Sequence, residues 1–333
     1  MTYPAARANP VELHINAHNA IRLFILLAFI VLGVTYGLLV PPFENLDEVE
    51  HFEVVRYIAA TGRLPVHGRP DGERYHYRQE ASQPPLYHLL AAGLVRLASL
   101  PTEPPTLRPN PRVACGPHVA NLYDNRAVLY HNPNAEAFPW RGALLTLHVL
   151  RLWSTLLQVG TVIGSYALAR RAFPRSPTVA LLAMSIVAFN PQFIFVASDV
   201  SNDNLVTPLA VGALYLLLRI WQDGPTAGSV AGVGLLTGLA GLAKLSGWLL
   251  LPLALLVLAA QTVTGRIPRR TLLLSALLLI AIPALTSAWW FWRNWRLYGD
   301  LTALTPMLAL VGRRDSPIHP LYETRLMFLS FWG

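Results

Sequence analysis

Residues 21–40 read IRLFILLAFIVLGVTYGLLV, and residues 41–51 follow directly with PPFENLDEVEH. The first stretch holds one charged residue, Arg22, and its length of about 20 residues suffices to cross a bilayer as a helix. The second stretch places Asp47, Glu48, Glu50 and His51 where that helix leaves the membrane. Titratable groups are costly to hold near lipid and commonly serve a function. Together the two stretches predict a spanning helix that leads into an active site.

The composition supports a membrane protein. Hydrophobic residues make up 53% of the 333 residues, charged residues make up only 13%, and the mean hydropathy is +0.41. A soluble domain of this size is far less apolar. Cys115 is the single cysteine, so an internal disulfide is excluded and helix packing must hold the fold. The net charge of +8 is then a sign of membrane topology and not of nucleic-acid binding.

Apolar runs predict seven spanning helices and therefore an all-α polytopic membrane protein. The predicted spans are 21–40, 143–169, 178–197, 205–221, 230–243, 248–263 and 271–292. With a cytoplasmic N-terminus, the basic turns at 170–175 and 266–270 both face the cytoplasm, as the positive-inside rule requires. The predicted regions are a cytoplasmic segment 1–20, the first span 21–40, an outer loop 41–142, a bundle 143–292 and an outer segment 293–333.

Residues 84–100 are apolar but are predicted not to span the membrane. The segment is short, it carries His88 and Arg96, and counting it as a span would turn both basic turns outward. We therefore expect an amphipathic helix on the outer membrane surface, capped by Ser82. Five leucines are expected on its lipid side: Leu86, Leu89, Leu90, Leu94 and Leu97.

The acidic run also has the pattern of a helix start. Asn45 is predicted as the cap, with Glu48 in the capping-box position three residues on. Asp47, Glu50 and His51 then share one helix face. Asp47 is the first candidate for a catalytic base. Glu48 has two interpretations, helix capping and catalysis, and Glu50 is either part of the site or on a solvated helix face.

Several other polar residues lie at predicted outer helix ends, and each has two interpretations. Lys244, the sole lysine, either binds phosphate or extends to the membrane interface. Arg293 and Arg296 lie among tryptophans, which fits either phosphate binding or an aromatic belt. Asp203 either binds sugar hydroxyls or belongs to a solvated turn.

Two signals inside the second span concern packing. Arg151 is costly in lipid, so we expect it to face a polar region and to hold the acidic residues of the outer loop in place. Gly160 and Gly164, four residues apart, predict a close approach of a neighbouring helix.

The order of these pieces resembles the GT-C membrane glycosyltransferases, in particular the bacterial relatives of protein O-mannosyltransferases and of lipid A aminoarabinose transferases. The resemblance rests on short motifs spread over nearly the whole chain. They are Asp47-Glu48 with His51 and Phe52, Gln83-Pro84-Pro85-Leu86-Tyr87, Ala169-Arg170-Arg171-Ala172-Phe173, Ser201-Asn202-Asp203-Asn204-Leu205, Gly241-Leu242-Ala243-Lys244, and Trp292-Arg293-Asn294 followed by Tyr298-Gly299-Asp300.

The resemblance implies a GT-C-like bundle in the bacterial inner or plasma membrane, with its active site on the extracytoplasmic face. The implied reaction is inverting transfer of a sugar from a polyprenyl-phosphate donor, with Asp47 as base and Glu48 beside it. The substrate-binding residues that it implies are His51, Arg78, Gln83, Tyr87, Asp203, Lys244, Arg293 and Arg296. Gln83 departs from the family pattern, in which a basic residue before the Pro-Pro-Leu motif contacts the lipid phosphate.

Alternatives from other classes remain at this point. Asp47, Glu50 and His51 would offer oxygen and nitrogen ligands to a divalent metal, but we assign none because no second carboxylate pair has a matching spacing. A transporter would place charges at mid-bilayer, usually in inverted repeats. The family generally continues with further helices beyond the apolar residues 328–333, so we also expect an N-terminal part of such an enzyme, or a non-catalytic subunit whose membrane partner supplies the missing helices.

Overall fold

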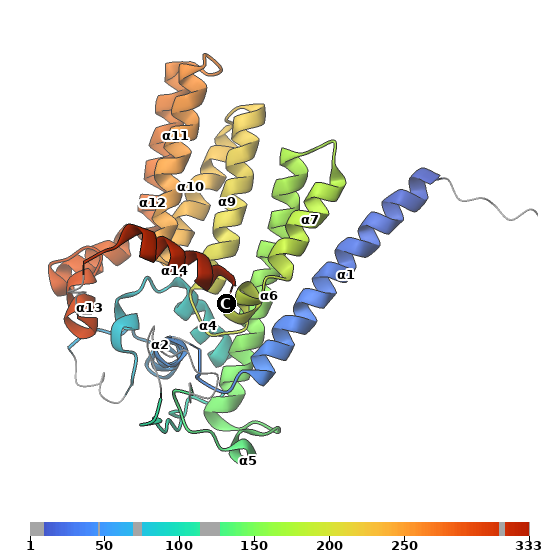
Figure 1. The fold of residues 1–333 in the computed structure, drawn as a ribbon. Coiled ribbons are helices and arrows are strands. Elements are labelled where there is room, and N and C mark those ends of the chain that lie inside the picture. The colour runs from blue at the N-terminus through green and yellow to red at the C-terminus, as the bar shows by residue number, and fades with distance from the viewer. Residues whose placement is uncertain (1–9, 46, 69–74, 114–126, 313–316, 333) are drawn as a thin grey trace, which may run out of the picture.

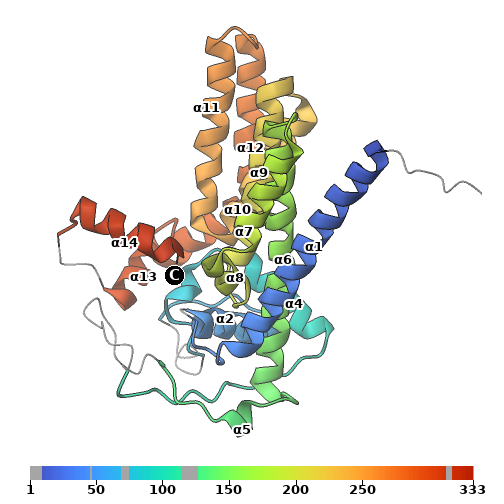
Figure 2. The ribbon, with the colours of Figure 1, turned by 45° about the vertical axis from the view of Figure 1, so that its right-hand side comes forward.

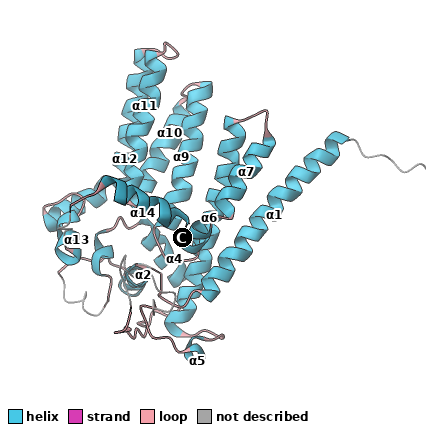
Figure 3. Cartoon of the chain, viewed as in Figure 1, coloured by secondary structure: helices cyan, strands magenta, loops and turns pink. Residues whose placement is uncertain are grey.

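The protein is described by a computed structural model that covers residues 10–45, 47–68, 75–113, 127–312 and 317–332. In these ranges every named element is a helix, and one isolated β-bridge pairs Pro109 with Leu129 (Figure 3). Cys115 lies outside the described residues. The helices form an elongated bundle with a lobe of short elements at one end (Figures 1 and 2).

Five helical segments in the described part of the chain are long and apolar enough to cross a membrane. They are α1 (Pro10–Leu39, spanning from Ala17), α6 (Gly142–Ala172), α9 (Asp203–Asp223), η2 with α11 (Leu245–Leu249 and Leu250–Val263) and α12 (Arg269–Tyr298). A sixth candidate is the bent pair α7 (Pro177–Ala188) and α8 (Pro191–Ala197), and α10 (Ala227–Ala243) is a shorter apolar helix. The predicted all-α multi-span class is confirmed, but the described residues give five candidate spans, or six with the bent pair, and not the predicted seven.

The predicted span 178–197 is not one straight helix. Its two halves, α7 and α8, meet at an angle of 62°. The residue before a proline disfavours the helical conformation, so Asn190 leaves the helix ahead of Pro191. The Asn190 side chain then accepts a hydrogen bond from the backbone N–H of Phe193 and caps α8. The bend is thus encoded by the Asn-Pro step.

Glycines allow the spanning helices to approach closely. A Cβ at Gly160 would lie 3.3 Å from Pro208, and one at Gly164 would lie 2.5 Å from Val211, so both glycines of α6 face α9. This confirms the predicted packing role of the pair. On α10, a Cβ at Gly238 would collide with Thr286 of α12.

The 41–142 loop forms the lobe at one end of the bundle. It contains α2 (Glu48–Thr61), η1 (Arg78–Ser82), α4 (Leu86–Leu97) and α5 (Pro133–Glu136). The core of the lobe packs α2 and α4 against α6, with Phe52, Tyr87, Val95 and Leu150 all buried. Beyond α12, α13 (Leu304–Val311) contacts η1, and α14 (Pro320–Trp332) contacts α8.

Helix α4 has the predicted amphipathic character. Leu89, Leu90 and Leu97 are exposed, whereas His88 and Ala91 are buried on the opposite face. Leu86 and Leu94, also predicted on the lipid side, are half-buried and pack against the core of the lobe. The predicted cap is wrong, because the helix begins after Pro85 and Ser82 instead donates its hydroxyl to the carbonyl of Gln79.

The opposite end of the bundle gathers the start of α1 and the turns that join α6 to α7, α9 to α10 and α11 to α12 (Figure 1). The basic residues of 170–175 and 266–270 therefore lie at one end, and the acidic 41–51 segment lies at the other. This is the relative arrangement that the basic turns predicted.

Candidate functional site

Helix α2 begins differently from the capping-box prediction. Its N-cap residue is Asp47, in the left-handed conformation with φ 60° and without a side-chain capping bond. Asn45 is buried and makes no side-chain hydrogen bond, so it does not cap the helix. The turn directs the Asp47 carboxylate outward, where the side-chain amide of Gln79 donates to Oδ1 at 2.9 Å.

Glu48 points the other way and forms a fully buried ion pair with Arg151 of α6. The guanidinium donates to both carboxylate oxygens, from Nε at 2.8 Å and from Nη2 at 2.6 Å. Glu48 also accepts the backbone N–H groups of Phe43 and Val200. The predicted role of Arg151 in holding the loop's acidic residues is confirmed. Glu48 is corrected from capping and catalysis to a structural role, because its carboxylate has no exposure to an acceptor.

Arg151 also anchors the end of α1. It donates Nη1 to the carbonyls of Gly37 and Val40, and Nη2 to the carbonyl of Pro41. A single guanidinium thereby joins α1, the start of α2 and α6. This network fixes where the chain leaves α1, and hence the position of Asp47.

Glu50 lies one turn along α2, near the exposed Arg78, with 3.8 Å between Arg78 Nη1 and Glu50 Oε1. Partial burial raises the pKa of Glu50 above its usual value, and the neighbouring Asp47 charge adds to the rise. Glu50, Asp47 and Arg78 therefore lie close together at the rim of the lobe.

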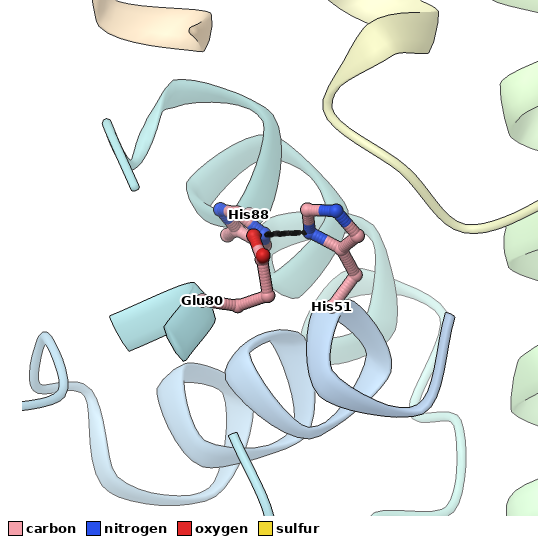
Figure 4. A group of neighbouring side chains, drawn as sticks. All are labelled: His51, Glu80 and His88. Atoms are coloured by element: carbon pink, nitrogen blue, oxygen red, sulfur yellow. Dashed lines mark hydrogen bonds and ion pairs between the residues drawn. The ribbon is translucent and has the colours of Figure 1, made fainter. Parts of the chain in front are cut away.

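His51, Glu80 and His88 meet in the buried interior of the lobe, one from each of α2, η1 and α4 (Figure 4). His51 Nδ1 lies 2.9 Å from His88 Nε2 and 3.3 Å from Glu80 Oε2. Burial lowers the pKa of His88 to about 3 and holds the pKa of His51 well below 6.5. Burial also raises the pKa of Glu80 to about 8, and the charge of Asp47 contributes to this rise.

Two segments of the bundle complete the site. Lys244, between α10 and η2, donates Nζ to both carboxylate oxygens of Asp203 at 2.7 and 2.8 Å. The Asn202 side chain donates to the carbonyl of Ala243 and, at 3.5 Å, to Gln83 Oε1. Both members of the Lys244–Asp203 pair remain partly exposed.

These contacts define a polar centre between the lobe and the bundle. Burial is the main cause of the raised pKa of Glu80. The charges of Asp47, Lys244, Glu50 and Asp203 also affect this pKa. The centre comprises Asp47, Glu50, His51, Gln79, Glu80, Gln83, His88, Asp203 and Lys244.

Three predicted substrate-binding residues are not among the described residues that define the polar centre. Tyr87 is fully buried and its hydroxyl pairs with that of Ser154, 2.8 Å away, so it contributes to packing between the lobe and α6. Arg293 donates to the carbonyl of Pro65 at 2.6 Å and stacks on Trp290, which attaches α12 to the lobe. Arg296 is exposed on the last turn of α12.

An apolar cavity of about 640 Å³ lies beside the polar centre, between η2 and α12. Leu245, the neighbour of Lys244, lines this cavity together with Trp248, Phe291 and Trp292. An apolar surface therefore begins at the residue that follows Lys244 in the chain.

The possible metal ligands that the sequence suggested, Asp47, Glu50 and His51, are not the group that the structure brings together. Among the described residues, the group with converging ligand atoms is His51, Glu80 and His88, and it includes neither Asp47 nor Glu50. Sequence reasoning missed Glu80 and His88. The signal for His88 was its place on α4 opposite the leucines, which directs it into the protein.

Comparison with protein families gives a match over the helical bundle. Residues 141–292 match the family model described as dolichyl-phosphate-mannose-protein mannosyltransferase, a GT-C type. The matched range covers α6 to α12 and supports a membrane glycosyltransferase of the GT-C kind. Comparison with curated proteins and with solved structures gave no significant match.

Proposed function

We propose that the protein transfers a sugar from a polyprenyl-phosphate carrier to an acceptor on the extracytoplasmic face of a bacterial cell membrane, with inversion at the anomeric carbon. The family match of residues 141–292 supports the enzyme class. The observation that carries the proposal is that an exposed carboxylate, Asp47, and a partly exposed ammonium group, Lys244, both lie near enough to the buried Glu80 to affect its pKa.

Asp47 is the proposed base. Its carboxylate removes the proton from the acceptor nucleophile while that nucleophile attacks the anomeric carbon. The bond from this carbon to the phosphate oxygen breaks, and the electron pair leaves with the lipid phosphate. Gln79 orients the base, because its amide donates to Asp47 Oδ1 at 2.9 Å.

The leaving phosphate needs a positive charge, which Lys244 supplies in this proposal. Lys244 is paired with Asp203, and Leu245, the next residue, lines the apolar cavity, so an incoming phosphate would replace part of that pairing. The cavity next to it fits the hydrocarbon tail of the carrier, and its tryptophans suit the membrane interface. Arg78, which is exposed near Asp47, is the second cation proposed for the leaving phosphate. Asp203 and Gln83 are the residues proposed to bind sugar hydroxyls.

The test measures transfer from a radiolabelled polyprenyl-phosphate sugar in membranes that contain the full chain. Asp47→Asn keeps the size of the side chain but removes the base, so transfer should fall by about 10²–10⁴-fold at normal protein level. Asp223→Asn is the matched control, because Asp223 pairs with Arg171 at the other end of the bundle and its loss should leave transfer unchanged. Equal transfer by Asp47→Asn and the wild type would contradict the proposed mechanism.

The main alternative is a non-catalytic GT-C-like subunit that works with a membrane partner. It predicts no transfer by the wild-type chain alone, and recovery of transfer only when a co-purifying partner is present. If the Asp47→Asn chain supports that recovered transfer as well as the wild type does, the catalytic base belongs to the partner.

A further inference from the structure

We propose that His51, Glu80 and His88 form a binding site for a divalent transition metal ion, most suitably Zn²⁺. The inference does not rest on the proposed sugar transfer, and the site is built from three elements of the lobe: α2, η1 and α4 (Figure 4). Its ligand atoms are His51 Nδ1, His88 Nε2 and Glu80 Oε2.

The spacing of these three atoms suits one small cation. Zinc binds imidazole nitrogen and carboxylate oxygen at about 2.0–2.2 Å, so neighbouring ligand atoms lie about 3–3.5 Å apart around the ion. Here the two nitrogens are 2.9 Å apart, and His51 Nδ1 is 3.3 Å from Glu80 Oε2. All the ligand atoms of the group lie within 4.8 Å of one another.

Hydrogen bonding alone leaves this cluster unsatisfied. His51 Nδ1 carries at most one hydrogen, so it cannot donate to both His88 and Glu80. Glu80 Oε2 is buried and has no hydrogen-bond partner, although it points at the two imidazoles. A buried carboxyl oxygen without a partner is costly. A cation that displaces the Glu80 proton would be bound by the carboxylate and both imidazoles at once.

The donor set indicates the class of metal. Two imidazoles and one carboxylate suit zinc and related transition metals better than calcium or magnesium, which prefer oxygen ligands. Burial also holds both histidines in the neutral form that binds metal. Three protein ligands leave one position for water.

A bound ion would position the proposed base. It would tie η1 to α2 and α4 through Glu80, and the preceding residue, Gln79, donates to Asp47. The metal would therefore fix the segment that orients Asp47, without contact between the ion and the Asp47 carboxylate being required.

The test is metal analysis of the full chain, purified in detergent without a histidine tag and dialysed against a buffer in which trace zinc is the sole added transition metal. We expect one zinc ion per chain in the wild type and at most a tenth of that in Glu80→Gln, which keeps the shape of the side chain. His131→Gln is the matched control, since His131 also lies between two carboxylates, those of Glu44 and Glu136. Each ring nitrogen of His131 faces a different carboxylate. Asp47→Asn should keep its zinc while losing transfer, which separates this proposal from the preceding one.

A second measurement covers the case in which Glu80→Gln fails to fold, as judged by size-exclusion chromatography. Titration of the metal-free wild type with Co²⁺ should give the intense visible absorption of a low-coordinate site with a stoichiometry of one, and zinc should abolish it. A wild type without zinc that also gives no such spectrum would overturn the proposal, as would equal zinc contents in folded Glu80→Gln and the wild type.

Discussion

At the scale of single residues, the Glu48–Arg151 pair organises the start of the site. Both side chains are buried, and the pair makes seven hydrogen bonds among the described residues. Two join the guanidinium to the carboxylate, three run from Arg151 to backbone carbonyls at the end of α1, and two run to Glu48 from backbone N–H groups before α2 and before α9. Burial of two charges is costly, so the pair is expected to matter more when it is broken than when it is replaced as a whole.

Glu48→Gln should destabilise the protein strongly. The change leaves the Arg151 guanidinium buried without its counter-charge, for which a loss of about 3–5 kcal/mol is typical. Thermal unfolding of the purified chain in detergent would measure it. The control is Asp223→Asn, which breaks the more exposed pair with Arg171 and should cost no more than about 1 kcal/mol.

The same experiment separates the two roles of Glu48. A structural role predicts that Glu48→Gln lowers the unfolding temperature and that Arg151→Met added to it restores part of the loss, because the unpaired charge is then gone. If Glu48→Gln unfolds at the wild-type temperature while transfer is abolished, the residue is catalytic and the structural assignment is wrong.

The sequence predicted some of these residues and not others for a physical reason. Arg151 could be expected to face the acidic loop, because an arginine in a spanning helix needs a partner. Which carboxylate it would meet could not be derived, since Glu48 is 103 positions away and the left-handed Asp47 turn decides that Glu48 faces inward. Glu80 was missed because no local sequence pattern indicates that η1 folds back so that Glu80 reaches His51 of α2 and His88 of α4.

At the scale of secondary structure, apolar runs located the long helices but not the break between α7 and α8. Hydropathy is blind to a bend inside an apolar run, whereas the Asn190-Pro191 step carries the information. The break matters for the site, because α8 leads directly into the 198–202 turn, which supplies Asn202 and is followed by Asp203 at the start of α9.

Asn190→Ala should loosen α8. The side chain caps the helix by accepting the N–H of Phe193 at 3.0 Å, and loss of such a cap costs about 1 kcal/mol. Hydrogen exchange measured by mass spectrometry should become faster over 191–197. Ser176→Ala is the matched control, because Ser176 also precedes a proline at a helix start but makes no side-chain capping bond. Equal exchange in the two variants would show that the cap does not hold α8.

At the scale of the whole molecule, the separation of charge between the two ends of the bundle is the property that the sequence predicted most directly. The arginines of 170–175 and 266–270 lie at one end, and the 41–142 loop with the polar centre lies at the other (Figure 1). The arrangement follows from span lengths alone, whereas the side of the membrane that each end faces follows from the positive-inside rule.

That orientation predicts the labelling of two engineered cysteines in intact cells. Thr106 in the loop and Thr264 after α11 are both exposed threonines, at opposite ends of the bundle. In a Cys115→Ser background, Thr106→Cys should react with a membrane-impermeant maleimide added from outside. Thr264→Cys should react only after the membrane is permeabilised, because the adjacent Arg266, Arg269 and Arg270 hold its turn in the cytoplasm. The opposite pattern would place the polar centre in the cytoplasm, where Asp47 could not serve an extracytoplasmic acceptor.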